Sequence, residues 1–466
     1  MQQKISMAFV MCNSEDRISL DEIVLAVSSA YEDKAFAELL TLILSMIQEI
    51  VVGRISSKSP DAPSCCGDGR LVLNGHYRRR IRTSIGDVVL TVKKVKCPVC
   101  GKSFAPLLRH VNIGKYQTKS NEFERLVVET VSETSYRRGM GQLARDGRNA
   151  PPFRTANGWV LRTDCDEMQI PLDACGVVNA CGKAGEEDKG NDKPSPLKVF
   201  ADGTGFKGEG VEGKARKGEL KAVMGVDVKG DVVPLGTYAD KSWAEISREW
   251  KDKGIRLPEG SILICDGEQG LADAFAEYVD DVQRCQWHVG RDLYHAMHQD
   301  GGGAETSRPY QKRLAGIMSI ELPKEDFQKV AEADRRSLEN RMAEAEGQVQ
   351  GLIDELSAKG YQKAADYLFK AKLGMFGYVR RWLKWGLVSP RASSMIERVM
   401  RELGRRIKRI AYGWSDKGVE KIAKIILKRY ADPEEWRKYW EKRNQPNGKV
   451  MAFVQNYRCS STNFAH

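Results

Sequence analysis

Two aspartates in the middle of the chain each follow a short apolar run and precede a glycine. Asp202 comes after Leu197–Ala201, and Asp266 comes after Ser261–Cys265. Both runs have the length and composition of a buried strand, so each carboxylate is expected at the carboxyl end of a strand, where open α/β sheets present their ligand-binding groups. An Asp-Gly pair after a strand is also ordinary turn chemistry, which leaves a structural interpretation for either residue alone.

A third carboxylate, Glu397, lies far downstream in a segment whose apolar residues recur at helical spacing. Ser394 stands three residues before it, which is the spacing of a capping box, and in that interpretation Glu397 only stabilises the first turn of a helix. Glu397 nevertheless lies at the margin of the apolar stripe, so its carboxylate can face a sheet on which the helix packs. Glu402 and Glu420 compete for the same role.

Cys285 and His288 follow another predicted strand, with two residues between them. A CxxH pair supplies only two of the four ligands that a structural zinc site needs. The alternatives are an inert thiol beside a hydrogen-bonded core histidine, or a His288 side chain that positions a phosphate.

Four other cysteines flank a segment with strand-like alternation. Cys97 and Cys100 form a CxxC knuckle of the kind that binds zinc, whereas Cys65 and Cys66 are adjacent and make a poorer second knuckle. The arrangement resembles a zinc ribbon, and reduced thiols in a core are the alternative. The histidines that could replace a missing thiolate are His76 and His110. Eleven cysteines, an odd number, do not indicate a disulfide framework.

The elements that must position these residues change character along the chain. Residues 20–55 have the apolar spacing of amphipathic helices, and residues 76–97 alternate as a β-hairpin with Val88, Leu90 and Val92 on one face. Short helices are predicted at Asn121–Arg145 and Arg154–Arg162. They are compatible with a helix-turn-helix, whose second helix enters the major groove of DNA.

Beyond a linker at 181–196, rich in Gly, Lys and Pro, predicted strands and helices alternate, which is typical of an α/β domain. The strands are expected at Leu197–Ala201, Lys221–Val228, Val232–Thr237, Ser261–Cys265 and Val282–Gln286, with helices at Trp243–Trp250, Leu271–Tyr278 and Val289–Met297. From 303 to 376 the pattern is entirely helical. Two further helices follow, at Ser394–Ile410 and Lys417–Arg429.

The net charge of +11 is concentrated in two segments. Residues 76–109 carry nine Lys or Arg against one acid, and residues 393–429 carry eleven against four. Such clusters are expected where a surface faces nucleic acid, although solvated basic faces look the same. The candidate DNA contacts are Arg78, Arg79, Arg80, Arg82, Arg154, Arg398, Arg401, Arg405, Arg406 and Lys408.

The bulk composition excludes several classes of protein. With 466 residues, 41% hydrophobic and 29% charged, the chain is expected to fold into two to four globular units, which argues against global disorder. No apolar stretch is predicted to span a membrane, and the first residues lack the layout of a signal peptide. We therefore expect a cytoplasmic protein associated with the nucleoid.

The order of these features resembles the Mutator-like class of insertion-sequence DDE transposases. The matching features are strand-Asp202-Gly, strand-Asp266-Gly, the CxxH that ends at His288, a long helical insertion, and Glu397-Arg398 at the start of a basic helix. The resemblance implies a ribonuclease H-like catalytic domain in which Asp202, Asp266 and Glu397 bind Mg²⁺ or Mn²⁺. It also implies cleavage of transposon ends and joining of 3′-hydroxyls to target DNA by two-metal-ion chemistry.

On this interpretation the partners are double-stranded DNA, namely terminal inverted repeats and a target, and a second copy of the chain in a homodimer or larger oligomer. The expected organisation is a helical segment at 1–60, a zinc-ribbon-like hairpin at 61–110, a helix-turn-helix-like segment at 111–180, the linker, a catalytic domain at 197–302 and 377–430, a helical insertion at 303–376 and a tail at 431–466. The alternatives are a non-catalytic DNA-binding protein derived from a transposase and a metal-dependent nuclease.

Overall fold

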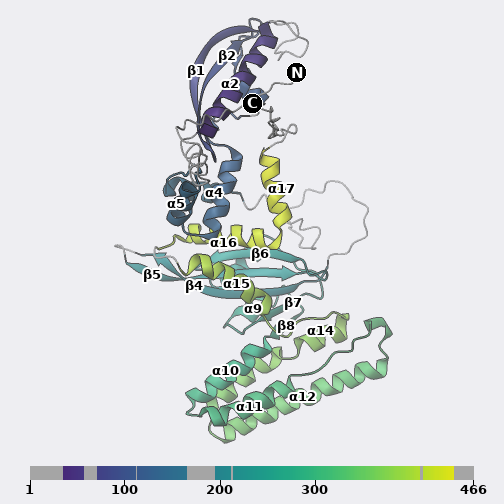
Figure 1. Cartoon of the computed structure of the whole chain (residues 1–466). Coiled ribbons are helices and arrows are strands. Elements are labelled where there is room, and N and C mark those ends of the chain that lie inside the picture. Colours follow the sequence, from purple (N-terminus) through teal and green to yellow (C-terminus); the bar gives the residue numbers. More distant parts are fainter. Residues whose placement is uncertain are drawn as a thin grey trace, which may run out of the picture. The chain divides into compact units, whose positions relative to one another are not determined.

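The computed structural model of the chain divides into two compact units (Figure 1). The described residues are 35–56, 71–111, 113–164, 195–210, 214–409 and 413–444. Unit 1 comprises Met1–Glu129, Arg138–Pro152 and Arg437–His466, and unit 2 comprises Thr130–Arg137 and Phe153–Trp436.

Unit 1 contains the β-hairpin that the alternation predicts. Strands β1 (Val72–Thr83) and β2 (Gly86–Lys96) pair antiparallel, and the short β3 (Ser103–Phe104) extends the sheet. Val88, Leu90 and Val92, which were expected to share one face of β2, are all buried. Helix α2 (Ala35–Ser56) packs on β2, where the Gln48 side chain donates to the Thr91 carbonyl at 2.9 Å and accepts from the Lys93 amide at 2.8 Å.

Helix α2 is also the one described helix that is long and apolar enough to cross a membrane, by length and composition alone. The stretch is Phe36–Ile55, with a mean hydropathy of 1.7. Helices that pack in protein cores pass the same test, and in the structure Leu40, Leu44 and Ile47 pack against the hairpin core. We therefore interpret α2 as a packing element of unit 1.

The other elements of unit 1 are helical. They are α3 (Pro106–His110), most of α4 (Asn121–Glu133), most of α5 (Tyr136–Arg145) and most of α17 (Pro433–Asn444). Within this unit the Asn121 side chain donates to the Arg443 carbonyl at 2.6 Å, which joins α4 to α17. Helix α6 (Phe153–Arg162) falls in unit 2, so the helix-turn-helix remains a prediction.

Unit 2 is built on a five-stranded mixed sheet in the order β6-β5-β4-β7-β8. The strands are β4 (Lys198–Glu209), β5 (Ala215–Val226), β6 (Val232–Ala239), β7 (Ile262–Cys265) and β8 (Asp281–Arg284). The first three pair antiparallel, and β7 and β8 run parallel to β4. The α/β class is therefore confirmed for this unit.

The two faces of this sheet are covered by different helices. Val199 and Ala201 of β4 share a core with α8 (Trp243–Asp252) and α9 (Leu271–Phe275). Side chains alternate along a strand, so Phe200, Asp202 and Thr204 lie on the opposite face. Helix α15 (Ser394–Ile407) packs on β4 and α16 (Asp416–Ala431) on β6, and Figure 1 shows α16 and α9 on opposite sides of the sheet.

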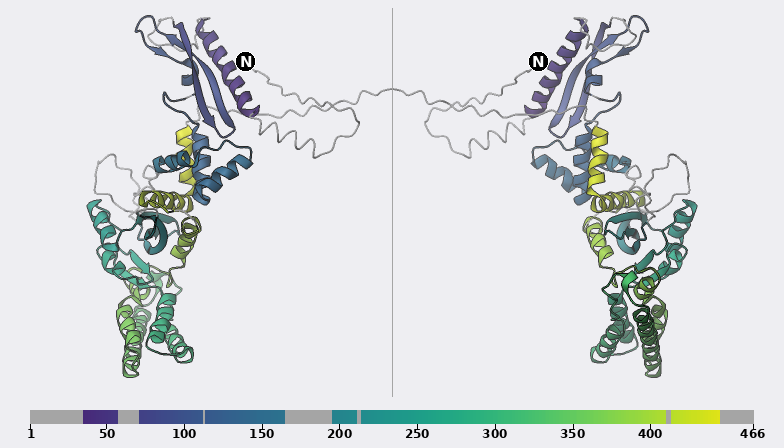
Figure 2. Two further views of the ribbon diagram at one scale, coloured as in Figure 1. Left: turned by 90° about the vertical axis from the view of Figure 1, so that its left-hand side faces the viewer. Right: turned by 90° about the vertical axis from the view of Figure 1, so that its right-hand side faces the viewer.

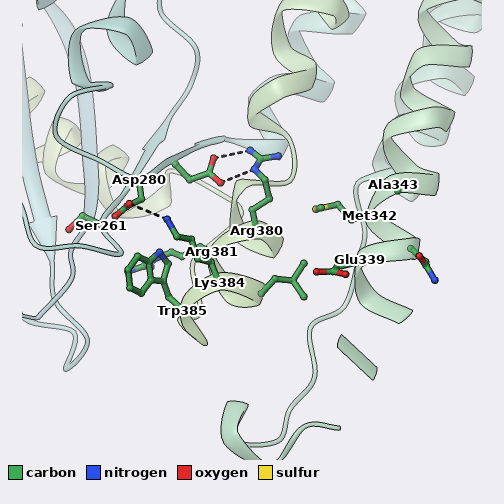
Figure 3. Close-up of a pocket in the computed structure, with 12 residues that line it drawn as sticks. Ser261, Asp280, Glu339, Met342, Ala343, Arg380, Arg381, Lys384 and Trp385 are labelled. Carbon is green, nitrogen blue, oxygen red and sulfur yellow. Dashed lines mark hydrogen bonds and ion pairs between the residues drawn. The ribbon is translucent and has the colours of Figure 1, made fainter. Parts of the chain in front are cut away.

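The helical insertion predicted at 303–376 is part of a larger bundle whose core also includes residues of the flanking helices α10 and α14, seen at the lower end of both views in Figure 2. Its elements are α10 (Gln286–Gln299), α11 (Ala304–Ile317), η2 (Phe327–Lys329), α12 (Glu332–Ala358), α13 (Gln362–Ala371), η3 (Lys372–Gly374) and α14 (Gly377–Trp385). Arg380 of α14 binds Asp281 of β8 through two 2.8 Å contacts, beside a cavity of about 630 Å³ (Figure 3). This bidentate pair attaches the bundle to the edge strand of the sheet.

Candidate active site

Asp202 and Asp266 are brought level by the register of the two central parallel strands. Val199 pairs with Leu263 and Phe200 with Ile264. The same offset, continued by two residues, places Asp202 beside Asp266. The two aspartates are therefore neighbours at the point where β4 and β7 separate.

The prediction that the first strand ends at Ala201 is wrong. β4 continues to Glu209, paired along its whole length with β5, so Asp202 lies inside the strand. Only the second Asp-Gly pair has turn geometry, since Gly267 adopts a φ of +96°. A tight turn therefore does not explain why an aspartate stands at position 202.

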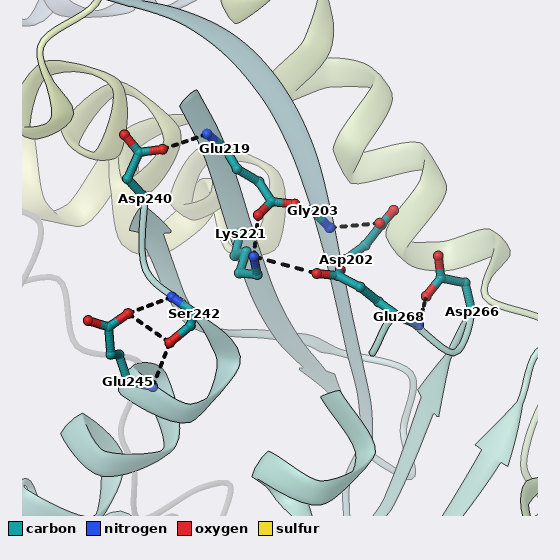
Figure 4. A network of polar contacts seen from close by, with 9 residues as sticks. All are labelled: Asp202, Gly203, Glu219, Lys221, Asp240, Ser242, Glu245, Asp266 and Glu268. Atoms are coloured by element: carbon teal, nitrogen blue, oxygen red, sulfur yellow. Dashed lines mark hydrogen bonds and ion pairs between the residues drawn. The ribbon is translucent and has the colours of Figure 1, made fainter. Parts of the chain in front are cut away.

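Asp202 is partly buried and lies near other carboxylates. Burial and the nearby charge of Asp266 raise the pKa of Asp202 to about 6, and Glu268 adds to the rise. The Gly203 amide donates to Asp202 Oδ1 at 2.7 Å and opposes part of this effect. Asp266 is held in turn by the amide of Glu268 at 3.0 Å (Figure 4). Two partly buried acids that repel each other are a natural position for a cation.

Glu397 lies in the first turn of α15, the helix that packs on β4. The capping box predicted from Ser394 is absent: Ser394 is the first helical residue, and the N-cap Ser393 makes no side-chain bond to the backbone. Instead the Ser393 hydroxyl donates to Glu397 Oε1 at 3.0 Å. The competing Glu402 is paired with Arg405 at 2.7 Å.

Among the described residues, no group of three or more His, Cys, Asp or Glu side chains lies close enough to hold a metal ion. The structure therefore brings Asp202 and Asp266 together but leaves Glu397 on Ser393. Because Ser393 occupies only Oε1, Glu397 can keep this hydrogen bond and offer its other oxygen to a metal ion, but its side chain must move closer to the two aspartates to complete a three-carboxylate site.

Cys285 and His288 form a hydrogen-bonded cluster with Ser393. The Ser393 amide donates to Cys285 Sγ at 3.4 Å, and its hydroxyl lies 3.4 Å from His288 Nδ1. Burial alone would raise the pKa of Cys285, but hydrogen bonds with His288 and Ser393 outweigh it and lower the pKa to about 7. The bond with Cys285 raises the pKa of His288. The CxxH pair thus contacts the residue that holds Glu397, a connection that the sequence does not reveal.

A second polar network lies beside Gly203, on the face of β4 opposite the Asp202 side chain (Figure 4). The buried Lys221 ammonium binds Glu219 and lies 3.5 Å from Glu268 Oε1. A Cβ at Gly203 would lie 2.8 Å from Glu219 Oε1, so glycine leaves room for this carboxylate. Lys221 was predicted only as a strand residue, because nothing in its local sequence shows the acids that surround it.

Two of the four cysteines of the predicted zinc ribbon, Cys97 and Cys100, lie among the described residues. Cys97 is buried and Cys100 exposed in a turn closed by the Gly101 amide, which donates to the Cys97 carbonyl at 2.8 Å. His76 and His110 do not join them in a group of three or more potential ligands among the described residues. Cys65 and Cys66 lie outside those residues.

Some of the basic side chains predicted to contact DNA are exposed, and others are buried or bound to other parts of the protein. The exposed ones are Arg78, Arg80, Arg154, Arg398, Arg401, Arg405 and Lys408, of which Arg80 is paired with Asp87 and Arg405 with Glu402. Arg82 is half-buried, and Arg79 donates to the Gln117 carbonyl at 2.8 Å. Arg406 is only 2% exposed, which corrects its assignment as a surface DNA contact.

No protein-family model matches the chain, and no curated protein matches its sequence. The function is therefore argued from the geometry of this site and from the order of its motifs.

Proposed function

We propose that the protein is a DNA transposase that cleaves transposon ends and joins their 3′-hydroxyls to target DNA. The observation that carries the proposal is the pair Asp202 and Asp266, level on neighbouring parallel strands and close enough for one to raise the pKa of the other. The resemblance to Mutator-like transposases adds Glu397, on a helix that packs on β4. The mixed sheet with β4 at its centre is compatible with a ribonuclease H-like domain.

The chemistry of these side chains fits Mg²⁺ or Mn²⁺. Hard divalent cations prefer oxygen ligands, and a cation shared by Asp202 and Asp266 would remove the repulsion that raises the pKa of Asp202. Bound cations would stabilise negative charge on the attacking and leaving oxygens of a phosphodiester. Glu397 would complete the ligand set through its other carboxylate oxygen, with Oε1 still held by Ser393 Oγ.

The remaining residues bind and orient DNA. Arg291 carries a charge that interacts with Asp266 and lies 5.1 Å from the Trp287 ring, so it can contact a phosphate beside the carboxylates. Arg398, Arg401 and Lys408 are exposed on the helix that carries Glu397, where they would neutralise the DNA backbone. Two transposon ends must be held together, which favours a homodimer or a larger oligomer.

The test incubates the full chain and Mg²⁺ or Mn²⁺ with a DNA carrying the inverted repeats and a target plasmid. We expect joined product from the wild-type protein and none from Asp266→Asn, while Asp231→Asn, which neutralises an exposed turn carboxylate, keeps full activity. Nicking without joining would favour the nuclease. DNA binding without any cleavage in the wild-type protein would favour the non-catalytic alternative.

A further inference from the structure

A cavity of about 320 Å³ in unit 2 lies away from the carboxylates. It is lined by residues from five segments, among them Tyr136, Phe153, Arg154, Asn157, Arg406 and Trp414. Glu209, which also lines it, stands at the end of β4 seven residues beyond Asp202, roughly 23 Å at the usual rise of a strand. None of the three proposed catalytic carboxylates lines this cavity.

The wall of the cavity contains a buried guanidinium with unsatisfied hydrogen-bond donors. Arg406 Nε donates to the Val131 carbonyl at 2.6 Å, but both terminal nitrogens have no hydrogen-bond partner among the described residues. The Tyr136 hydroxyl is likewise buried and unpaired in this part of the chain. Buried donors without acceptors are costly and rare, so a cluster of three around one cavity indicates a ligand that supplies acceptor oxygens.

The rings around this guanidinium add a second requirement for the ligand. Arg406 lies 5.4 Å from the Tyr136 ring centroid and 4.8 Å from that of Trp414. Phe153, which is 40% exposed, contributes a further ring at the opening. Rings of this kind bind flat aromatic groups by stacking.

The charges of the cavity indicate an anion. Of the described residues that line it, three are arginines and Glu209 is the acidic one. An arginine donates two parallel hydrogen bonds to phosphate, which matches the two free terminal nitrogens of Arg406. An anionic phosphate joined to a flat ring is the chemistry of a nucleotide.

We propose that this cavity binds one nucleotide, with its phosphate on Arg406 and its base among the rings of Trp414, Tyr136 and Phe153. The nucleotide is either free or an unpaired residue of a DNA strand. The inference shares with the proposed function only the assumption that nucleotides are ligands of this protein, and it needs none of the catalytic carboxylates.

The test measures binding to full-length Asp266→Asn protein, which separates binding from cleavage. The probes are a fluorescent blunt duplex, the same duplex with a three-nucleotide single-stranded tail, and dAMP as competitor. Because Arg406 is buried and its variants risk misfolding, the informative variants are Phe153→Ala and Arg154→Ala at the opening. Matched controls are Phe369→Ala and Arg308→Ala, both exposed in the helical insertion.

We expect each opening variant to weaken binding of the tailed duplex or of dAMP about tenfold, the effect of losing one stacking or phosphate contact, and the controls to change nothing. A loss seen only with the tailed duplex identifies an unpaired nucleotide of DNA, and a loss seen with dAMP alone identifies a free nucleotide. The inference is overturned if tailed and blunt duplexes bind equally and dAMP does not bind. It is also overturned if both opening variants bind like their controls. If the wild-type protein joins no strands while these binding results hold, the transposase proposal is rejected and the cavity assignment stands.

Discussion

Replacing Asp202 by asparagine should stabilise the metal-free protein at neutral and alkaline pH. Burial and the charge of Asp266 raise the pKa of Asp202 from 3.8 to about 6 in the folded state. The folded protein then holds a proton that the unfolded chain has already lost, so stability falls as pH rises through this range. An asparagine side chain is neutral at every pH and can still accept the hydrogen bond from Gly203.

The size of the effect follows from the rise in pKa. A change from 3.8 to about 6 corresponds to about 3 kcal/mol at most. The side chain is partly exposed, and solvent screening reduces the expected gain to about 1–2 kcal/mol. The gain should be small near pH 3, where both states are largely protonated, and complete above pH 7.

Urea unfolding in EDTA at pH 4.5, 6 and 8 measures this gain, with Asp231→Asn as a control in which an exposed carboxylate is neutralised. Addition of Mg²⁺ in excess of the EDTA should reverse the order, since a cation held by Asp202 and Asp266 stabilises only the wild-type protein, by about 2.7 kcal/mol at a hundred times its dissociation constant. An Asp202→Asn protein that is no more stable than wild type at pH 8 without metal would refute the reasoning.

Three further substitutions test other parts of the structure. Ser393→Ala removes the hydrogen bond to Glu397 and should lower strand joining about tenfold, with rescue by Ser393→Thr; full activity in the alanine variant would show that this serine does not position the carboxylate. Gly377→Ala places a Cβ 2.3 Å from a backbone carbonyl of β8 and should cost about 2 kcal/mol in urea unfolding, and a stability equal to wild type would contradict this close approach. Tyr238→Phe leaves the buried Trp250 indole nitrogen without its 2.7 Å partner and should cost about 1–2 kcal/mol, whereas an unchanged melting temperature would show that the bond contributes nothing.

The sheet could be predicted from the sequence because its strands carry strong apolar signals and the helices between them are amphipathic. The end of β4 could not, because Asp202 and the glycines after it have the composition of a turn. In the structure these glycines are strand residues whose missing side chains leave space for neighbours: a Cβ at Gly203 would lie 2.8 Å from Glu219 Oε1, and one at Gly208 would lie 2.9 Å from Arg216. Pairing with a distant strand overrides the local turn signal.

Only the two aspartates of the candidate site could be predicted from the sequence, because both follow apolar runs that predict strands. The apolar runs before Asp202 and Asp266 single out both residues in the sequence, although the first strand continues beyond Asp202, and the observed parallel register places them side by side. Ser393, Lys221 and Arg406 were missed or misassigned because their roles depend on residues more than 40 positions away in the sequence or on burial that a local charge pattern hides. Arg406 shows this most clearly, since it stands in a basic helix yet is buried between two aromatic rings.

Binding of Mn²⁺ to the wild-type protein, followed by the electron paramagnetic resonance signal of the free ion, tests the central claim that Asp202 and Asp266 share a divalent cation. The account predicts bound Mn²⁺ that Mg²⁺ displaces, and at least a tenfold weaker affinity in both Asp202→Asn and Asp266→Asn, with Asp231→Asn unchanged. Equal affinity and stoichiometry in the wild-type protein and in both aspartate variants would contradict it.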